Sequence, residues 1–306
     1  MTDERIGVVV MAYGTPASPE DVEPYYTHIR RGRPPSPEQL ADLQRRYDAL
    51  GGTSTLARRT ADQVDAIARA LEADHPGRFL VALGQKHAEP FIEDGVAALA
   101  EAGATQIVGA VLAPHYSGFS VGQYQERAQA AAAAAGLPAR GIERWHDLDA
   151  YRAFLADAVV DGLAVLPTRT EVVFTAHSLP ERVLADDPYP DELAASATAV
   201  AERLDLPRWS MAWQSAGATP EPWRGPDILE VLRNRASTRE VDAVLVCAQG
   251  FVADHLEVAY DLDIEAATLA GELGMGFART RVLNDDAGVL EALAARVATV
   301  AFEGAL

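Results

Sequence analysis

Short apolar runs rich in Val recur along this chain, and each ends in polar or aromatic residues at a turn. The run Ile6–Ala12 is followed by YGTP at 13–16, and the run 106–113 is followed by PHYS at 114–117. Such continuous runs are typical of strands buried on both faces. Amphipathic helical segments separate them, so the pattern predicts parallel sheets with helices on both faces, an α/β fold.

The second half of the chain repeats this rhythm. The expected strands after residue 148 are 171–176, 209–213 and 243–248. A length of 306 residues suits two domains of ordinary size. We therefore predict two similar α/β lobes, 1–147 and 148–306, with a cleft between them and a long C-terminal helix at 287–302 closing the second lobe.

Functional side chains in such sheets gather beyond the carboxyl ends of the strands. Tyr13, His87, His115 and His177 each follow an apolar run closely. A lone His is more often structural than catalytic. A neutral imidazole facing a carboxylate is suited both to accepting a proton and to ligating a divalent metal.

The segment 250–265 (GFVADHLEVAYDLDIE) follows the last expected strand. On an α-helix, Asp254, Glu257, Asp261 and Glu265 would share one face, with Asp263 opposite. Apolar residues occupy most of the remaining circumference, which indicates a buried helix. Buried carboxylates need protons, basic partners or cations, so the segment suggests metal handling; a surface helix with a solvated acidic face is the alternative.

Charge and cysteine content narrow the functional classes. The formal net charge of −19 argues against nonspecific nucleic-acid binding and is compatible with attracting cations. The single cysteine, Cys247, excludes an internal disulfide and a multi-cysteine cluster. Neither a signal-peptide pattern nor an apolar run of about twenty residues is present, so we expect a cytoplasmic protein without a membrane span.

Basic residues crowd into one short N-terminal region of this acidic chain. A solvated surface would account for them, but the cluster also suits an anionic small molecule, because arginine forms paired hydrogen bonds with carboxylates. The cluster comprises Arg30, Arg31, Arg33, Arg45, Arg46, Arg58 and Arg59.

Several common catalytic motifs are absent. The chain has no G-x-x-x-x-G-K-[ST], no G-x-G-x-x-G after its first strand and no H-E-x-x-H. Residues 176–180 (AHSLP) follow a strand as a hydrolase elbow does, but Ala and Pro replace both elbow glycines. Nucleotide-binding, zinc-peptidase and acyl-transfer hydrolase functions are therefore disfavoured.

An ordered set of segments resembles ferrochelatases over nearly the whole chain, and most closely the coproporphyrin ferrochelatases of Gram-positive bacteria. The segments are MAYGTP (11–16), YYTHIRRGRPP (25–35), RYDALGGTS (46–54), APHYSGFSV (113–121), TAHSLPERV (175–183), DPYPDEL (187–193), WQSAGATPEPWRGPD (213–227) and GFVADHLEVAYDLDIE (250–265). The resemblance implies two Rossmann-like lobes around a porphyrin cleft. It also implies insertion of Fe²⁺ into coproporphyrin III, in haem biosynthesis.

Site residues follow from the matching motifs. The resemblance implies that His177 and Glu257 handle the metal on one side of the macrocycle, one accepting pyrrole protons and the other holding iron; which residue does which stays open. Asp261 and Glu265 resemble the family's outer carboxylates, which form either a relay or a second cation site that would take Mg²⁺. Iron enters as a substrate, and no tightly bound cofactor is expected.

On the opposite face of the ring, Tyr13 resembles the residue that ligates iron in the product. Four propionates on coproporphyrin III, against two on protoporphyrin IX, would explain the arginine-rich region. Positions matching those that hold propionates and line the cleft are Arg30, Arg46, Tyr47, Ser54 and Tyr124.

The sequence also departs from the family pattern. Thr55 stands where a proline usually follows Ser54, and Cys247-Ala248-Gln249 replaces a more apolar lead into GF. One cysteine excludes the iron–sulfur cluster that some relatives carry. Two alternatives remain, insertion of iron into protoporphyrin IX and a noncatalytic haem or porphyrin carrier. The resemblance implies a monomer.

Overall fold

The computed structural model describes residues 5–303, which form two compact units. Unit 1 comprises residues up to Trp145 and from Asn284 onward, and unit 2 comprises His146–Leu283. The strands of unit 1 form a four-stranded, fully parallel sheet in the order β2-β1-β3-β4. They are β1 (Arg5–Ala12), β2 (Phe79–Gln85), β3 (Ala104–Val111) and β4 (Ala139–Ile142).

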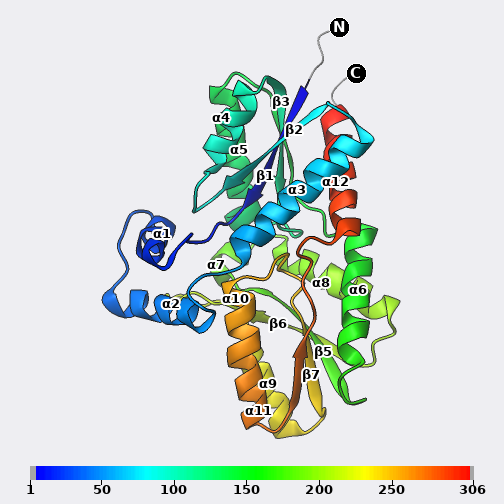
Figure 1. Ribbon diagram of the computed structural model, residues 1–306. Coiled ribbons are helices and arrows are strands. Elements are labelled where there is room, and N and C mark those ends of the chain that lie inside the picture. Colours follow the sequence, from blue (N-terminus) through cyan, green and yellow to red (C-terminus); the bar gives the residue numbers. More distant parts are fainter. Residues whose placement is uncertain (1–4, 304–306) are drawn as a thin grey trace. The chain divides into compact units, whose positions relative to one another are not determined.

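Helices cover both faces of this sheet. Helices α3 and α12 pack together on one face, and α4 and α5 on the other (Figure 1). The helices of unit 1 are α1 (Val22–Ile29), α2 (Pro37–Ala49), α3 (Leu56–Asp74), α4 (Ile92–Glu101), α5 (Gln123–Ala134) and α12 (Ala287–Phe302), with a 3₁₀ turn at Pro19–Asp21 and a π-helical turn at Gly118–Gly122.

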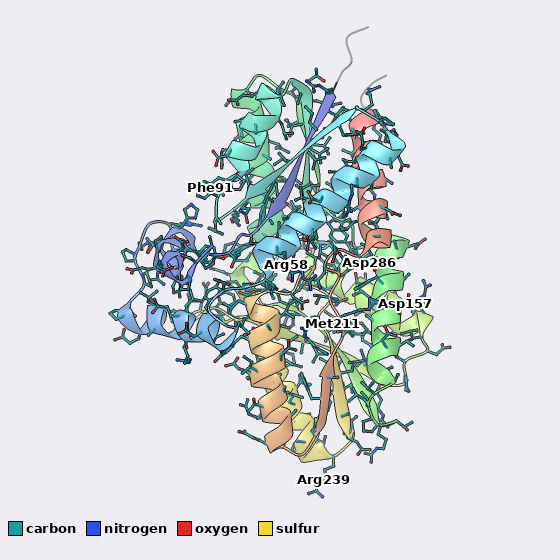
Figure 2. All side chains as sticks on the ribbon, in the orientation of Figure 1. Arg58, Phe91, Asp157, Met211, Arg239 and Asp286 are labelled. Carbon is teal, nitrogen blue, oxygen red and sulfur yellow. The ribbon has the colours of Figure 1, made fainter. Side chains whose placement is uncertain are left out.

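Local capping explains where several of these helices begin. Ser36 caps α2 in a reciprocal capping box with Gln39, and Pro37 occupies the first turn. Asp286 lies at the start of α12 (Figure 2) and caps it, because its side chain accepts a hydrogen bond from the main-chain N–H of Val289.

Unit 2 repeats the architecture. Its parallel sheet has the order β6-β5-β7-β8. The strands are β5 (Thr170–His177), β6 (Trp209–Gln214), β7 (Ala243–Cys247) and β8 (Gly276–Arg279). The helices are α6 (Asp149–Leu163), α7 (Glu181–Leu184), α8 (Tyr189–Arg203), α9 (Ile228–Thr238), α10 (Leu256–Val258) and α11 (Ala267–Glu272), with a π-helix at Ala259–Ala266.

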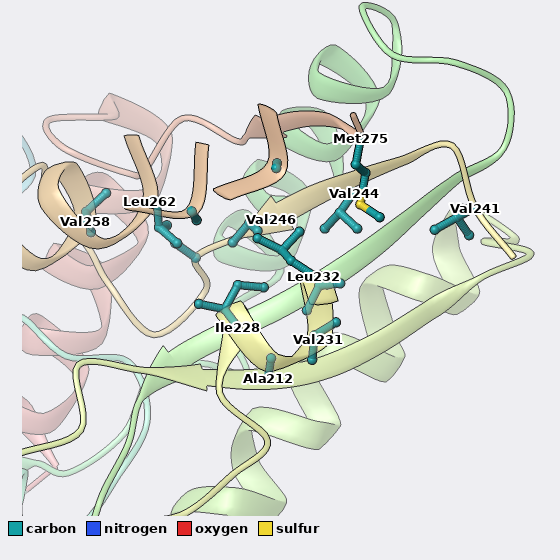
Figure 3. Close-up of a cluster of buried hydrophobic side chains, with 14 of the residues drawn as sticks. Ala212, Ile228, Val231, Leu232, Val241, Val244, Val246, Val258, Leu262 and Met275 are labelled. Atoms are coloured by element: carbon teal, nitrogen blue, oxygen red, sulfur yellow. The ribbon is translucent and has the colours of Figure 1, made fainter. Parts of the chain in front are cut away.

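A buried cluster attaches the acidic segment to this sheet. Val258 and Leu262 pack with Leu232 of α9 and with Val244 and Val246 of β7 (Figure 3). All five side chains are almost inaccessible to solvent. Burial of one apolar side of the segment therefore fixes which of its residues face away from the core.

The predicted α/β class with two parallel sheets is confirmed, and three features differ from expectation. Helix α12, expected to close the C-terminal lobe, packs against α3 and β4 in unit 1. The edge strand β8 was not expected. The single α-helix predicted for the acidic segment is a three-residue α10 followed by a π-helix. Within the described residues, no helix has both the length and the apolar character needed to cross a membrane.

Candidate active site

His177 is the last residue of β5, where the sequence predicted an imidazole at a strand end. Its Nδ1 lies 2.5 Å from the Ser178 carbonyl oxygen, which can only accept, so Nδ1 carries a proton. The opposite ring nitrogen, Nε2, lies 3.5 Å from Oε1 of Glu257. The structure thus brings together the two residues that the motifs paired.

Glu257 lies in α10, within unit 2. Gln214, which neighbours His177 in the β5–β6 register, donates from Nε2 to the Glu257 carbonyl oxygen over 3.2 Å. The second carboxylate oxygen lies 3.4 Å from Nε2 of His255. One carboxylate therefore faces two imidazoles, and its backbone is tied to the strand beside His177.

His255 is a residue of this site that the sequence patterns did not predict. The available signal was its place two residues before Glu257, because an extended residue at a helix start can turn its side chain to the same side as the residue two positions on. The backbone of His255 is extended there, with φ of −152°.

Electrostatics make the pair an ion pair near neutral pH. Burial of the imidazole acts to lower the pKa of His177, but the Glu257 carboxylate outweighs it and raises that pKa to about 9. Burial acts in the opposite direction on Glu257, but His177 and His255 hold the pKa of the carboxyl well below its ordinary value. The side chains are 34% and 38% exposed, so the pair remains open to a substrate.

The outer carboxylates are arranged differently from the predicted row. Asp261 is buried and accepts a hydrogen bond from the Ser215 hydroxyl. Glu265 is half-buried in the π-helix. Asp254 precedes the helical residues, and it shares Arg279 with Asp263. The prediction that these carboxylates share one helix face is therefore wrong, because the extended start and the π-helix change the angular position of each residue.

Tyr13 follows β1 in unit 1, and 44% of its surface is exposed. Its carbonyl accepts a hydrogen bond from the His87 N–H over 3.0 Å, and the two rings lie 4.7 Å apart. The next residue, Gly14, has φ of +93°, and a Cβ there would come within 2.8 Å of the Ala88 Cβ. A glycine is therefore required for the turn that presents Tyr13.

Cationic groups surround His87. Burial acts first to lower its pKa, with Lys86, His28 and Arg127 acting in the same direction, to about 3. The Lys86 amino group lies over the Tyr124 ring, 4.9 Å from its centroid. Lys86 was not predicted, although it directly follows β2, as Tyr13 directly follows β1.

The remaining predicted porphyrin-binding residues also belong to unit 1. Tyr124 and Tyr47 are buried, and the Tyr47 hydroxyl lies 3.4 Å from that of Thr15. Arg46 forms an ion pair with Asp42 over 3.2 Å. The other two residues make local contacts: Arg30 donates to the Arg33 carbonyl, and the Ser54 hydroxyl accepts from the Leu56 N–H. Their contact with a porphyrin, and the cleft between the lobes, stay predictions.

The described residues 5–303 offer few groupings of metal-ligating side chains. In that range, no group of three or more His, Cys, Asp or Glu side chains is arranged to hold a metal ion. A Mg²⁺ ion at Asp261 and Glu265 would need water or main-chain oxygens for its other ligands. That outer site stays a prediction.

The family model described as Ferrochelatase matches residues 5–301. The chain belongs to the ferrochelatase family. It is 42% identical to the coproporphyrin III ferrochelatase of Halalkalibacterium halodurans, with 96% of each chain covered. It is 41% identical to the coproporphyrin III ferrochelatase of Bacillus subtilis, over 96% of this chain and 97% of that protein. The resemblance seen in the motifs is thereby confirmed.

Solved structures of other chelatases match the fold of this chain. The sirohydrochlorin chelatase SirB of Bacillus subtilis subspecies spizizenii, in complex with cobalt, matches with a TM-score of 0.59 and 13% identity, over 98% of this chain and 97% of that one. SirB from Bacillus subtilis with Fe³⁺ gives a TM-score of 0.61 at 12% identity, with the same coverage. At such identities the likeness concerns the fold alone.

Proposed function

We propose that this chain is a ferrochelatase that inserts Fe²⁺ into coproporphyrin III to give Fe-coproporphyrin III, a step of haem biosynthesis. The observation that carries the proposal is the His177–Glu257 pair, with 3.5 Å between Nε2 and Oε1, at the carboxyl end of a parallel sheet. Full-length identity of 41–42% to proteins named coproporphyrin III ferrochelatase supports the choice of porphyrin.

The reaction sets requirements that the pair can meet. Fe²⁺ replaces the two pyrrole N–H protons, so two protons must leave the ring as the metal enters. The Glu257 carboxylate is deprotonated near neutral pH and can take a proton or ligate Fe²⁺. His177 must lose its proton before it can do either, because an imidazolium has no free lone pair. Which of the two holds the iron stays open.

We assign axial ligation of the product iron and the propionate contacts to residues of unit 1. Tyr13 would ligate the iron of the product through its exposed phenol. Arg30 and Arg46 would hold propionates, since arginine suits carboxylates, and Tyr47, Ser54 and Tyr124 would line the porphyrin site. The Arg46 side chain is 32% exposed and pairs with Asp42 over 3.2 Å.

Cellular setting is part of the proposal. We infer a cytoplasmic, monomeric enzyme. A single buried cysteine fits a reducing compartment, where disulfides are rare. Size-exclusion chromatography with light scattering tests the monomer: a molecular mass near 32.7 kDa is expected, and twice that mass would contradict it.

An anaerobic assay tests the activity. The purified chain is mixed with Fe²⁺ and either coproporphyrin III or protoporphyrin IX, and initial rates are followed by loss of free-porphyrin fluorescence. We expect turnover with coproporphyrin III at the higher rate. Faster turnover with protoporphyrin IX would reassign the substrate. Porphyrin binding without turnover of either would instead indicate a carrier.

A further inference from the structure

Arg279, the last residue of β8, contacts the acidic segment on both sides of Glu257. Its Nη2 donates to Oδ1 of Asp254 over 3.0 Å. Its Nε and Nη2 donate to the two carboxylate oxygens of Asp263 over 2.6 and 2.9 Å, a two-point contact. Its Nη1 donates to the Thr280 carbonyl over 3.2 Å. Each guanidinium nitrogen is thus engaged.

These contacts join two parts of the chain that differ in conformation. Asp254 lies three residues before Glu257, in the loop that leaves β7, and Asp263 lies six residues after it, in the π-helix. Between them, α10 is only three residues long. It forms the first turn of a helical stretch that continues directly into the π-helix Ala259–Ala266, and the first turn of a helix lacks intrahelical acceptors for its N–H groups. Arg279 therefore links the two ends of the stretch 254–263, which contains Glu257.

Arg279 also connects this stretch to the sheet that carries His177. Arg279 is in register with Val246 of β7, and the Thr280 N–H donates to the Val246 carbonyl over 2.8 Å. Strand β7 in turn pairs with β5, whose last residue is His177. His177 is therefore held by β5, and Glu257 is linked to the same sheet through Arg279 of β8.

We propose that Arg279 is a positioning residue for Glu257: by binding Asp254 and Asp263 together, it holds the intervening carboxylate toward His177. This inference rests on the proposed function to the extent that Glu257 acts in iron insertion. The Arg279 side chain is 19% exposed, so solvent competes little for its donors. Lysine cannot replace it, because an ammonium group lacks the planar donors for a two-point contact.

The test compares Arg279→Lys with Arg281→Lys. Arg281 lies two residues further on and forms an ion pair with Asp161 over 3.6 Å, away from the acidic segment. Both variants keep the charge. We expect Arg279→Lys to lower kcat for iron insertion by about 10- to 100-fold and to leave porphyrin affinity within about twofold, because displacing a reacting group by about 1 Å has effects of that size. Arg281→Lys should stay within about twofold of the unsubstituted chain.

A second readout does not depend on activity. Amide hydrogen exchange over 254–263 should be faster in Arg279→Lys than in Arg281→Lys, with exchange in β5 unchanged. Asp263→Asn, which weakens the two-point contact, should shift exchange in the same direction.

The outcomes separate the two proposals. Unchanged exchange over 254–263, or unchanged kcat in a folded Arg279→Lys protein, would overturn the positioning role. Exchange that is faster throughout unit 2 would also overturn it, since that result describes a general loss of stability. The unsubstituted chain could instead fail to insert iron while Arg279→Lys still shows faster exchange over 254–263. That result would support the positioning role of Arg279 and refute the proposed function.

Discussion

His87, two residues after β2 in unit 1, and His177, the last residue of β5 in unit 2, are both half-buried, yet near neutral pH the first is neutral and the second is protonated. Burial lowers the pKa of His87, and Lys86, His28 and Arg127 lower it further, to about 3. Burial acts on His177 in the same direction, but Glu257 reverses the result and raises the pKa to about 9. Position at a strand end and burial therefore do not set the protonation state alone, because a carboxylate at 3.5 Å reverses the effect of burial at His177.

The contrast suggests a division of labour. Unit 2 offers a carboxylate and an imidazole that can exchange protons and bind a cation. Unit 1 offers a neutral imidazole, a phenol and cationic groups, which suit the anionic edges of a porphyrin. The following variants probe that division.

The largest effect is expected for Glu257→Gln. Loss of the charge should lower kcat by about 10²- to 10⁴-fold, the range for removal of a general acid or base. Glu272→Gln, at an exposed position at the end of α11, is the matched control and should leave the rate unchanged. A normal rate for Glu257→Gln would remove the carboxylate from the chemistry.

Tyr13→Phe probes the other unit. It removes one hydroxyl and keeps the ring that contacts His87. If the phenol ligates iron in the product, the visible spectrum of bound Fe-coproporphyrin III should change, while affinity for the free porphyrin changes little. An identical spectrum would exclude Tyr13 as the axial ligand.

The turns beside Tyr13 and His177 each contain a glycine, and replacing each glycine by alanine compares how strongly the two turns depend on it. Ala at Gly14 would adopt a strained φ of +93° and place its Cβ 2.8 Å from Ala88. Ala at Gly250 would place its Cβ 2.6 Å from the Ala176 Cβ, beside His177. Each variant should lower the free energy of unfolding by about 1–3 kcal/mol in urea titrations. Gly136→Ala is the control for Gly14, since its φ is also positive but no atom lies within 4 Å of the added Cβ.

The smallest effect is expected for the pH dependence of the stability that the two imidazoles contribute. The raised pKa of His177 stabilises the fold fully below its unfolded value near 6.5, and this contribution is lost as pH rises to about 9. The lowered pKa of His87 has the opposite sign: its contribution is present above about 6.5 and is lost as pH falls to about 3. NMR titration of imidazole protons, assigned with His177→Gln and His87→Gln, should give these two values; similar values for both rings would contradict the comparison.

Much of this arrangement follows from local sequence. Apolar runs located five strands, β1, β3, β5, β6 and β7, to within a few residues. The resemblance to ferrochelatases paired His177 with Glu257, and their positions at the end of β5 and after β7 agree with that pairing.

Other features depend on contacts that local patterns do not contain. On an ideal α-helix Asp254 and Asp263 lie on opposite sides, yet an extended residue and a π-helix bring both to Arg279. Strand β8 has only four residues, too few for a distinctive pattern. Helix α12 belongs to unit 1 because of its packing against α3, which is distant in sequence.

The most direct test of the account is iron insertion by His177→Ala. With coproporphyrin III and Fe²⁺ under anaerobic conditions, the variant should bind the porphyrin with near-normal affinity and form product about 10²- to 10⁴-fold more slowly. His87→Ala, measured alongside, should retain most of the rate. Near-normal turnover by a folded His177→Ala protein would contradict the central claim that the imidazole–carboxylate pair of unit 2 carries the reaction.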